Sequence, residues 1–321
     1  MIASTAATIA TLLFLAFQNK QLQKVNEYQR EVTQAQLAAM NFEQYINHRR
    51  LFMDRLGELQ TTFENKFVFV DGEALYNRIF TKNGPTNLEF KVLPINDPSG
   101  ENLLGRLGAR LTRLDVFLNQ SQWDREGTRK LVGLLIDIYT DLQIRWDSES
   151  FDGDIVFFKT NTGINIYSLD EFLRVAKSIY NSLLFYTGNP LFTGFEKGMM
   201  RYPREALMEF FLDNAKLRES LDVVKNIPGL AIMERLFFRI DTLRDDSGSW
   251  VMPETYSALL KVFGSRKDVT KLREDAFVDE IVSLGCHECF DAMQRVGSEK
   301  DDYSTLQQCG NDLNLLISRN G

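Results

Sequence analysis

The sequence has few of the residues that carry catalysis or hold metals. Its 321 residues include three cysteines and two histidines, His48 and His287. Three cysteines do not make a framework of paired disulfides, and free thiols are typical of a reducing compartment. The scarcity of histidine leaves little material for histidine-based catalysis or for a histidine metal site.

Common catalytic and phosphate-binding motifs are also absent. Gly105 and Gly108 lack the lysine of a phosphate-binding loop and the third glycine of a dinucleotide fingerprint. No Gly-x-Ser-x-Gly elbow and no His-Glu-x-x-His pair occurs. In the acidic run that begins at Asp147, Phe151 and Asp152 stand where a calcium loop needs an oxygen ligand and a glycine. We therefore predict a protein that is not an enzyme and uses no cofactor.

Positive charge is scarce as well. The chain has 37 Lys and Arg against 44 Asp and Glu, a net charge of −7, and no densely basic stretch. Because binding to a phosphate backbone needs a positive face, the sequence does not favour a broad nucleic-acid interface. The apolar fraction of 44% is that of an ordinary globular protein.

What the sequence does have is an uncharged, apolar start. Residues 1–17 read MIASTAATIATLLFLAF and precede the polar Gln18. As a helix this run measures about 26 Å, slightly less than the roughly 30 Å of a bilayer's hydrocarbon core. A cleaved signal peptide would need a basic first segment and an Ala-x-Ala-like site, and neither is visible. We predict a transmembrane anchor in contact with membrane lipid; a buried helix and a helix lying on the membrane surface are the alternatives.

The positive charges next to this segment indicate its orientation. Lys20, Lys24 and Arg30 follow it, and only the α-amino group precedes it. The positive-inside rule then predicts a single-pass protein of the inner (cell) membrane with its body in the cytoplasm.

A long amphipathic helix is predicted to continue from the anchor over residues 18–60. No Pro or Gly interrupts it before Gly57, and apolar or small residues recur at alternating steps of three and four, which is the rhythm of a coiled coil. The predicted oligomerisation stripe consists of Val25, Tyr28, Val32, Ala35, Ala39, Phe42, Ile46, Met53 and Leu56. Self-association or binding of a protein partner is one interpretation of this stripe. An amphipathic helix folded onto its own body is the other.

The remainder predicts a mainly α-helical body with a small β-hairpin or a few short strands. Short apolar runs at 66–70, 88–92, 155–159 and 164–167 are typical of strands, and residues 160–163 are a candidate hairpin turn. Ser168 to Glu171 has the form of a capping box. Helical periodicity predicts further helices, among them 124–146, 204–226, 269–284 and 286–296. We divide the body at a soft boundary into a helical domain with short strands, residues 61–190, and a C-terminal helical domain, residues 191–321.

One cluster of candidate metal ligands stands out, Cys286-His287-Glu288-Cys289. Two cysteines three residues apart can share a metal ion, and Cys309 could add a third thiolate. Adjacent residues point in different directions on a helix, however, and cysteine also packs as a small apolar residue. Buried structural thiols are the favoured interpretation, and a metal- or thiol-dependent enzyme is the alternative.

The region beside the anchor resembles a group of known proteins. Its pattern is Phe42-Glu43-x-Tyr45-x-x-His48-Arg49-x-x-Phe52, then Leu56-x-x-Leu59-x-x-x-Phe63, then Leu75-Tyr76-x-x-x-Phe80-x-x-Asn83. This pattern resembles bacterial membrane-anchored proteins of phage defence, including abortive-infection proteins and retron-associated membrane effectors. The resemblance implies a protein that a partner keeps silent and that damages the host membrane once released. It supplies no catalytic residues. Many such effectors have two spanning helices, whereas this chain offers one, which makes oligomerisation through Val25 to Leu56 more important.

The sequence therefore predicts a membrane-anchored interaction protein without catalytic activity and, through the resemblance, an anti-phage effector controlled by a partner. An architectural subunit of a membrane complex is a third hypothesis.

Overall fold

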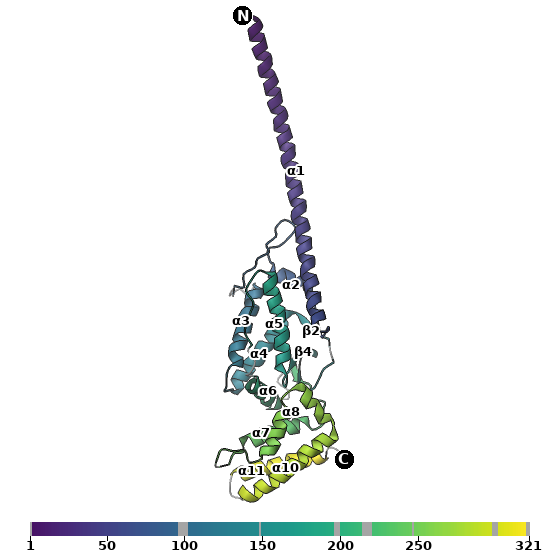
Figure 1. Cartoon of the computed structure of the whole chain (residues 1–321), viewed down its shortest axis with the longest axis vertical. Coiled ribbons are helices and arrows are strands. Elements are labelled where there is room, and N and C mark those ends of the chain that lie inside the picture. The colour runs from purple at the N-terminus through teal and green to yellow at the C-terminus, as the bar shows by residue number, and fades with distance from the viewer. Residues whose placement is uncertain are drawn as a thin grey trace.

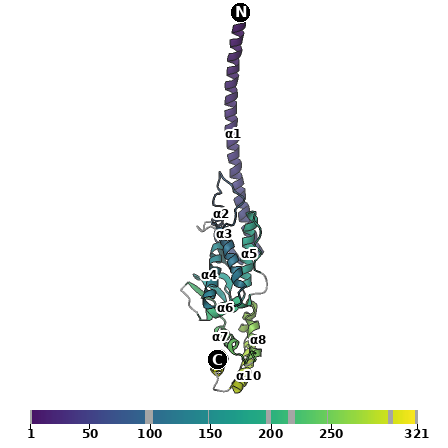
Figure 2. The ribbon, with the colours of Figure 1, turned by 90° about the vertical axis from the view of Figure 1, so that its left-hand side faces the viewer.

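The computed structural model shows one very long helix attached to an elongated helical body (Figure 1). It describes residues 2–95, 102–147, 149–195, 200–213, 220–245, 247–296 and 301–318, with side chains from Phe14 onward. Helix α1, Ile2–Thr62, runs without a break and carries the N-terminus away from the body, and the C-terminus lies in the opposite half of the molecule (Figure 2). The predicted continuity of residues 1–17 with the long helix is confirmed for the backbone from Ile2 on.

No helix in the described part of the chain is both long enough and apolar enough to cross a membrane. The predicted anchor, residues 1–17, falls mostly on positions 1–13, whose side chains lie outside that part.

The half of the body next to α1 is built from helices that share one core. These helices are α2 (Gly72–Ile79), α3 (Leu103–Leu118), α4 (Arg125–Leu142) and α5 (Leu169–Tyr186). The first three begin at Asp71, Asn102 and Asp124, whose side-chain oxygens accept a hydrogen bond from the amide three residues on, at 2.8, 2.9 and 2.6 Å. Their apolar stripes face one another, so Leu107 and Leu135 are completely buried.

Two small antiparallel sheets complete this half. Strand β1 (Phe67–Phe69) pairs with β2 (Ile144–Trp146), and a second sheet has the order β4-β3-β5, with β3 at Asp154–Phe157, β4 at Thr160–Asn165 and β5 at Leu221–Val223. The predicted hairpin is confirmed, but its turn is not at residues 160–163. Phe158 and Lys159, with φ of 47° and 63°, make the turn. Gly163 lies inside β4, where a Cβ atom would come within 2.2 Å of the Trp146 ring.

The far half of the body is helical. It contains α6 (Arg201–Asp213), α7 (Leu230–Thr242), α8 (Pro253–Val262), α9 (Arg266–Val269), the 3-10 helix η1 (Thr270–Arg273), α10 (Asp275–Val296) and α11 (Asp301–Ile317). The two halves share contacts across the predicted boundary at residue 190: β5 pairs with β3, and the Tyr167 hydroxyl donates to the buried Glu234 carboxylate at 2.5 Å.

Several predicted elements are wrong, each for a local reason. Residues 88–92 form a loop rather than a strand, because the amide and the carbonyl of Glu89 are both hydrogen-bonded to the side chain of Asn83. The helix predicted over 124–146 ends at Leu142, since Gln143 adopts the left-handed conformation and β2 follows. The capping box is wrong as well, because the Ser168 hydroxyl accepts from the Arg266 amide instead of capping α5.

The helices predicted over 204–226 and over the stretch from 269 to 296 also have different bounds. The first ends at Asp213, and β5 occupies residues 221–223. Cys286 lies in the middle of α10, which begins at Asp275, so no break separates residues 284 and 286.

The body repeats one ion-pair arrangement that sequence periodicity did not reveal. In each case an Arg-Leu-x-x-Arg segment places two guanidinium groups on one face of a helix, and both form ion pairs with the same aspartate of a neighbouring helix. We call this arrangement a clamp. The groups are Arg106 and Arg110 with Asp141, and Arg235 and Arg239 with Asp312. Both aspartates are buried. Since a buried carboxylate is tolerated only with such partners, the two clamps fix the packing of α3 on α4 and of α7 on α11.

Candidate functional site

Helix α1 contacts the body only near its C-terminal end. Over residues 14–46, which we call the stalk, every side chain is exposed except those of Asn41 and Tyr45, which are half-buried. From His48 onward one face of α1 is buried, and Phe52, Leu56 and Leu59 belong to the core of the body. The region where the stalk enters the body is therefore the most distinctive feature of the molecule.

Aromatic side chains from four segments meet at this point. We call this cluster the joint; it consists of Tyr45, His48, Phe52, Tyr76, Phe80, Phe90 and Tyr186. The His48 ring is at its centre, with centroid distances of 4.8 Å to Phe80, 5.1 Å to Phe90 and 4.9 Å to Tyr186. Most of these rings meet edge to face, the arrangement that aromatic quadrupoles favour.

Hydrogen bonds fix the rings of the joint. His48 Nδ1 lies 2.9 Å from the Tyr76 hydroxyl, which also accepts from Asn83 Nδ2 at 3.3 Å. The Tyr76 hydroxyl is thus held between the Asn83 amide and the His48 ring. The Tyr186 hydroxyl donates to the backbone carbonyl of His48 at 2.5 Å and so ties α5 directly to α1.

Burial keeps the joint uncharged at neutral pH. It lowers the pKa of His48 and raises the pKa of Tyr76 and of Tyr186. The nearest ion pair, Arg49 with Glu73 at 2.5 Å, lies at the rim, where Glu73 is largely exposed. A cluster of packed rings that is hydrogen-bonded through His48, Tyr76 and Tyr186 is suited to holding the stalk in a fixed direction.

The joint contains five of the thirteen residues that carry the resemblance. His48 and Phe52 of the first segment meet Tyr76 and Phe80 of the last, and Asn83 holds the Tyr76 hydroxyl. The spacing of these residues thus reflects one structural task. Sequence reasoning missed Phe90, which it assigned to a strand, and Tyr186, which no local signal connects with His48.

The predicted oligomerisation stripe is divided by the joint. Its first seven members, Val25 to Ile46, are exposed. Met53 is half-buried, and Leu56, at 4% exposure, packs in the core of its own body. The interpretation of a helix folded onto its own body therefore holds for Met53 and Leu56. For the seven exposed members, self-association or binding of a partner stays a prediction.

One residue of the Cys286-His287-Glu288-Cys289 segment, Glu288, connects α10 to the start of α8. The Glu288 carboxylate accepts from the amides of Glu254 and Thr255, at 3.0 and 2.8 Å, and from the Thr255 hydroxyl at 2.6 Å. It thereby caps the first turn of α8 from outside that helix. His287 is exposed on the surface.

The three thiols do not form a ligand set. Among the described residues no group of three or more His, Cys, Asp or Glu side chains could hold a metal ion. Cys289 donates to the carbonyl of Leu306 at 3.3 Å, and burial raises its pKa to about 11 and that of Cys309 to about 12. Protonated thiols are poor nucleophiles and poor metal ligands.

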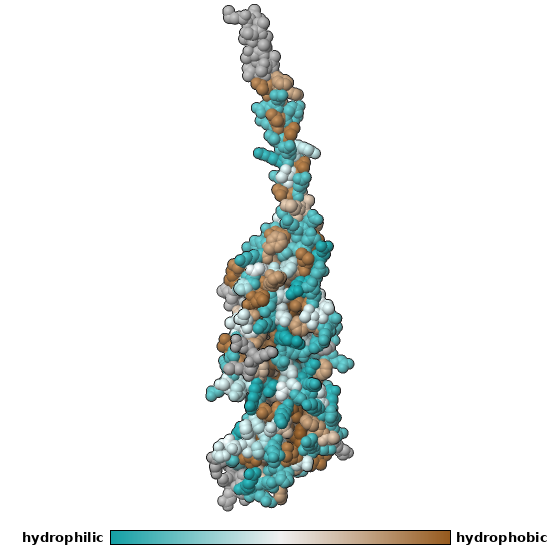
Figure 3. Space-filling view, viewed as in Figure 1, coloured by the Kyte–Doolittle hydropathy of each residue, from teal (hydrophilic) through white to brown (hydrophobic). Residues whose placement is uncertain are grey.

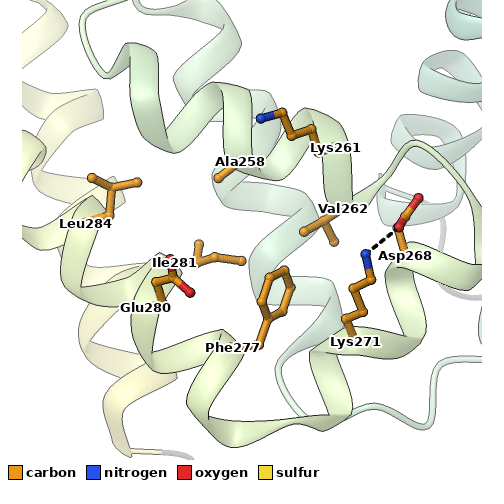
Figure 4. Close-up of a pocket in the computed structure, with 9 residues that line it drawn as sticks. All are labelled: Ala258, Lys261, Val262, Asp268, Lys271, Phe277, Glu280, Ile281 and Leu284. Atoms are coloured by element: carbon orange, nitrogen blue, oxygen red, sulfur yellow. Dashed lines mark hydrogen bonds and ion pairs between the residues drawn. The ribbon is translucent and has the colours of Figure 1, made fainter.

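One cavity of the far half has the wrong character for a cofactor site. It has a volume of about 230 Å³ and lies between α8, η1 and α10. Figure 4 shows Phe277 and Ile281 turned toward Val262, with the Lys271–Asp268 ion pair at the rim. Ligand pockets are typically about 300–1,000 Å³ with converging polar groups. This cavity is smaller than that range, and it is lined by the charged Lys261, Asp268, Lys271 and Glu280 together with apolar side chains.

No known protein family, no curated protein and no solved structure matches the chain.

Proposed function

We propose that this protein is a single-pass membrane-anchored interaction protein that works without catalysis. In this proposal residues 1–17 hold the chain in the inner membrane, the stalk projects into the cytoplasm from Gln18 onward, and the body binds a partner. The observation that carries it is the exposed stalk. Over residues 14–40 every side chain of the helix is exposed and gains nothing from core packing, so the length and direction of the helix must serve something outside the body.

The stalk has the dimensions of a spacer. Residues 18–44 span about 40 Å at 1.5 Å per residue. A body tethered through such a helix stands clear of the bilayer and can bind a large cytoplasmic partner. The basic residues Lys20, Lys24 and Arg30 near the membrane end favour this orientation.

The joint supports a signalling role for the stalk. Because α1 is continuous and the joint ties its base to α2 and α5, a change in the stalk is transmitted to the body without a flexible linker. The resemblance to phage-defence effectors adds the proposed setting: a partner holds the body silent, and its release during infection alters the stalk and the membrane.

An architectural subunit of a membrane complex would use the same stalk but would need no trigger. The two hypotheses differ in stoichiometry, which a mass measurement in mild detergent, with and without co-expressed neighbours, determines. The thiol-dependent enzyme has less support, since burial raises the pKa of Cys289 and Cys309.

The attachment of the chain to the membrane through residues 1–17, which we call the tether, is tested with one pair of variants in cells. Leu12→Arg places a charge in the predicted anchor, which costs about 2.5–3.5 kcal/mol near the centre of a spanning helix. Gln23→Arg places the same charge in the stalk. We expect the unsubstituted chain and Gln23→Arg to remain in carbonate-washed membranes and Leu12→Arg to leave them. The proposal fails if the unsubstituted chain washes off, or if protease added outside intact cells digests the body.

A further inference from the structure

The stalk carries an apolar face that the body does not cover. Figure 3 shows hydrophobic side chains spaced along it. The side chains of Val25, Tyr28, Val32, Phe42 and Ile46 are between 37% and 68% exposed. Together with Ala35 and Ala39 they form the exposed part of the stripe, which we call the seam.

The seam and the body occupy different faces of α1. At about 100° per residue, the seam lies about a third of a turn away from the face formed by His48, Phe52 and Leu56. Ile46 is 43% exposed although His48, two residues later, is buried. A second helix can therefore lie along the seam over its full length without meeting its own chain's body.

We propose that the seam binds the seam of a second copy of this chain, as a parallel, in-register, two-stranded coiled coil. The steps place Val25, Val32, Ala39 and Ile46 at a positions and Tyr28, Ala35 and Phe42 at d positions. β-Branched residues at a favour two strands in parallel dimers. Three heptads of uninterrupted apolar a and d residues meet the usual minimum for such a structure.

The charges of the stalk do not repel a second copy of the stalk. Residues 18–46 contain three basic and three acidic residues and are neutral overall, although the whole chain has a net charge of −7. In the parallel register the flanking g and e positions bring Lys24 beside Gln29 of the second copy and Glu31 beside Gln36 of the second copy. No pair of like charges faces across the seam. Like charges at these positions would repel the second helix and disfavour pairing.

The parallel direction follows from the tether, so this inference rests in that respect on the proposed function. Two chains anchored in one membrane present their stalks in the same direction. The bodies then lie at the same end, each on the outer side of its own helix.

Disulfide cross-linking of the full chain in membranes tests the pairing. Val25→Cys places a thiol at an a position at the end of the seam, and Asn26→Cys places one on the outward face as the matched control. In the parallel register the two copies of residue 25 face each other within disulfide reach. In an antiparallel pair residue 25 lies beside residue 42, about 25 Å from its counterpart.

With mild oxidation we expect Val25→Cys to give a species of twice the 37.0 kDa chain mass, well above the background from Asn26→Cys and from the unsubstituted chain. Equal yields from the two variants, no cross-linked species, or a product with a different protein would overturn the proposal. A dimer that forms while the chain washes off membranes would leave the pairing intact and refute the tether. A chain that stays in membranes without cross-linking would refute the pairing alone.

Discussion

Two neighbouring residues of α1 make the packing of the joint measurable. Phe52 is 1% exposed and meets the rings of Tyr76 at 5.4 Å, Phe80 at 6.2 Å and Tyr186 at 5.3 Å. Leu51 is 56% exposed on the other side of the same turn. Phe52→Ala removes a fully packed phenyl group, which costs about 3–5 kcal/mol of the free energy of unfolding. Leu51→Ala should change it by no more than about 0.5 kcal/mol. Alanine favours helix in both variants, so helix propensity does not account for the difference.

The assay is urea unfolding of the full chain in mild detergent, followed by the fluorescence of the tryptophans in the body. With a slope of about 3 kcal/mol per molar urea, a loss of about 4 kcal/mol lowers the midpoint by more than 1 M. Limited proteolysis gives a second readout, because a loosened joint should expose the chain between stalk and body to cleavage. Equal midpoints for the two variants would refute the packing of α1 on the body described above.

Three further predictions follow from buried polar groups. Burial holds the pKa of His48 in the folded protein below its ordinary value, so the unfolded chain takes up the proton first as the pH falls. The free energy of unfolding should therefore be full above about pH 6.5 and decrease as the pH drops from there to the pKa of the folded state. His48→Gln should remove this pH dependence from the urea midpoints. Asp141→Asn should cost about 3–5 kcal/mol in the same unfolding assay, because Arg78, Arg106 and Arg110 all lose the buried carboxylate that they share. Asp137→Asn, on an exposed side chain, should cost less than about 1 kcal/mol. The raised pKa of Cys289 and Cys309 should keep both thiols unlabelled by a maleimide at neutral pH in the native protein and allow labelling in denaturant, as intact mass would show.

The helices could be predicted from the sequence because their apolar periodicity coincides with burial. The helix predicted from residue 124 is one example, because α4 buries Leu131, Leu135 and Ile138. The errors lie where a single backbone conformation overrides the pattern. Ile144 and Trp146 continue the apolar rhythm of α4, yet the left-handed Gln143 ends the helix and turns them into a strand. Apolar spacing alone does not encode such a change.

The joint was only partly predictable. The residues of its α1 and α2 segments lie close enough in the sequence to form a recognisable pattern. Tyr186 is 138 residues from His48, whose carbonyl it binds, and Phe90 lies in a loop whose position depends on the side chain of Asn83. Contacts of this range arise from the folded topology, which the periodicity of a single sequence does not encode.

The joint also sets the length of the proposed seam. The apolar stripe runs without interruption from Val25 to Leu56, apart from Arg49, so the sequence does not show where its role changes. In the structure the change falls between Ile46, which is exposed, and Phe52, which is buried. Extending a coiled coil past Ile46 would require Met53 and Leu56 to leave the body and face a second helix. The body therefore competes with a second copy for the last part of the stripe, and the strength of the joint determines how far the two stalks can pair.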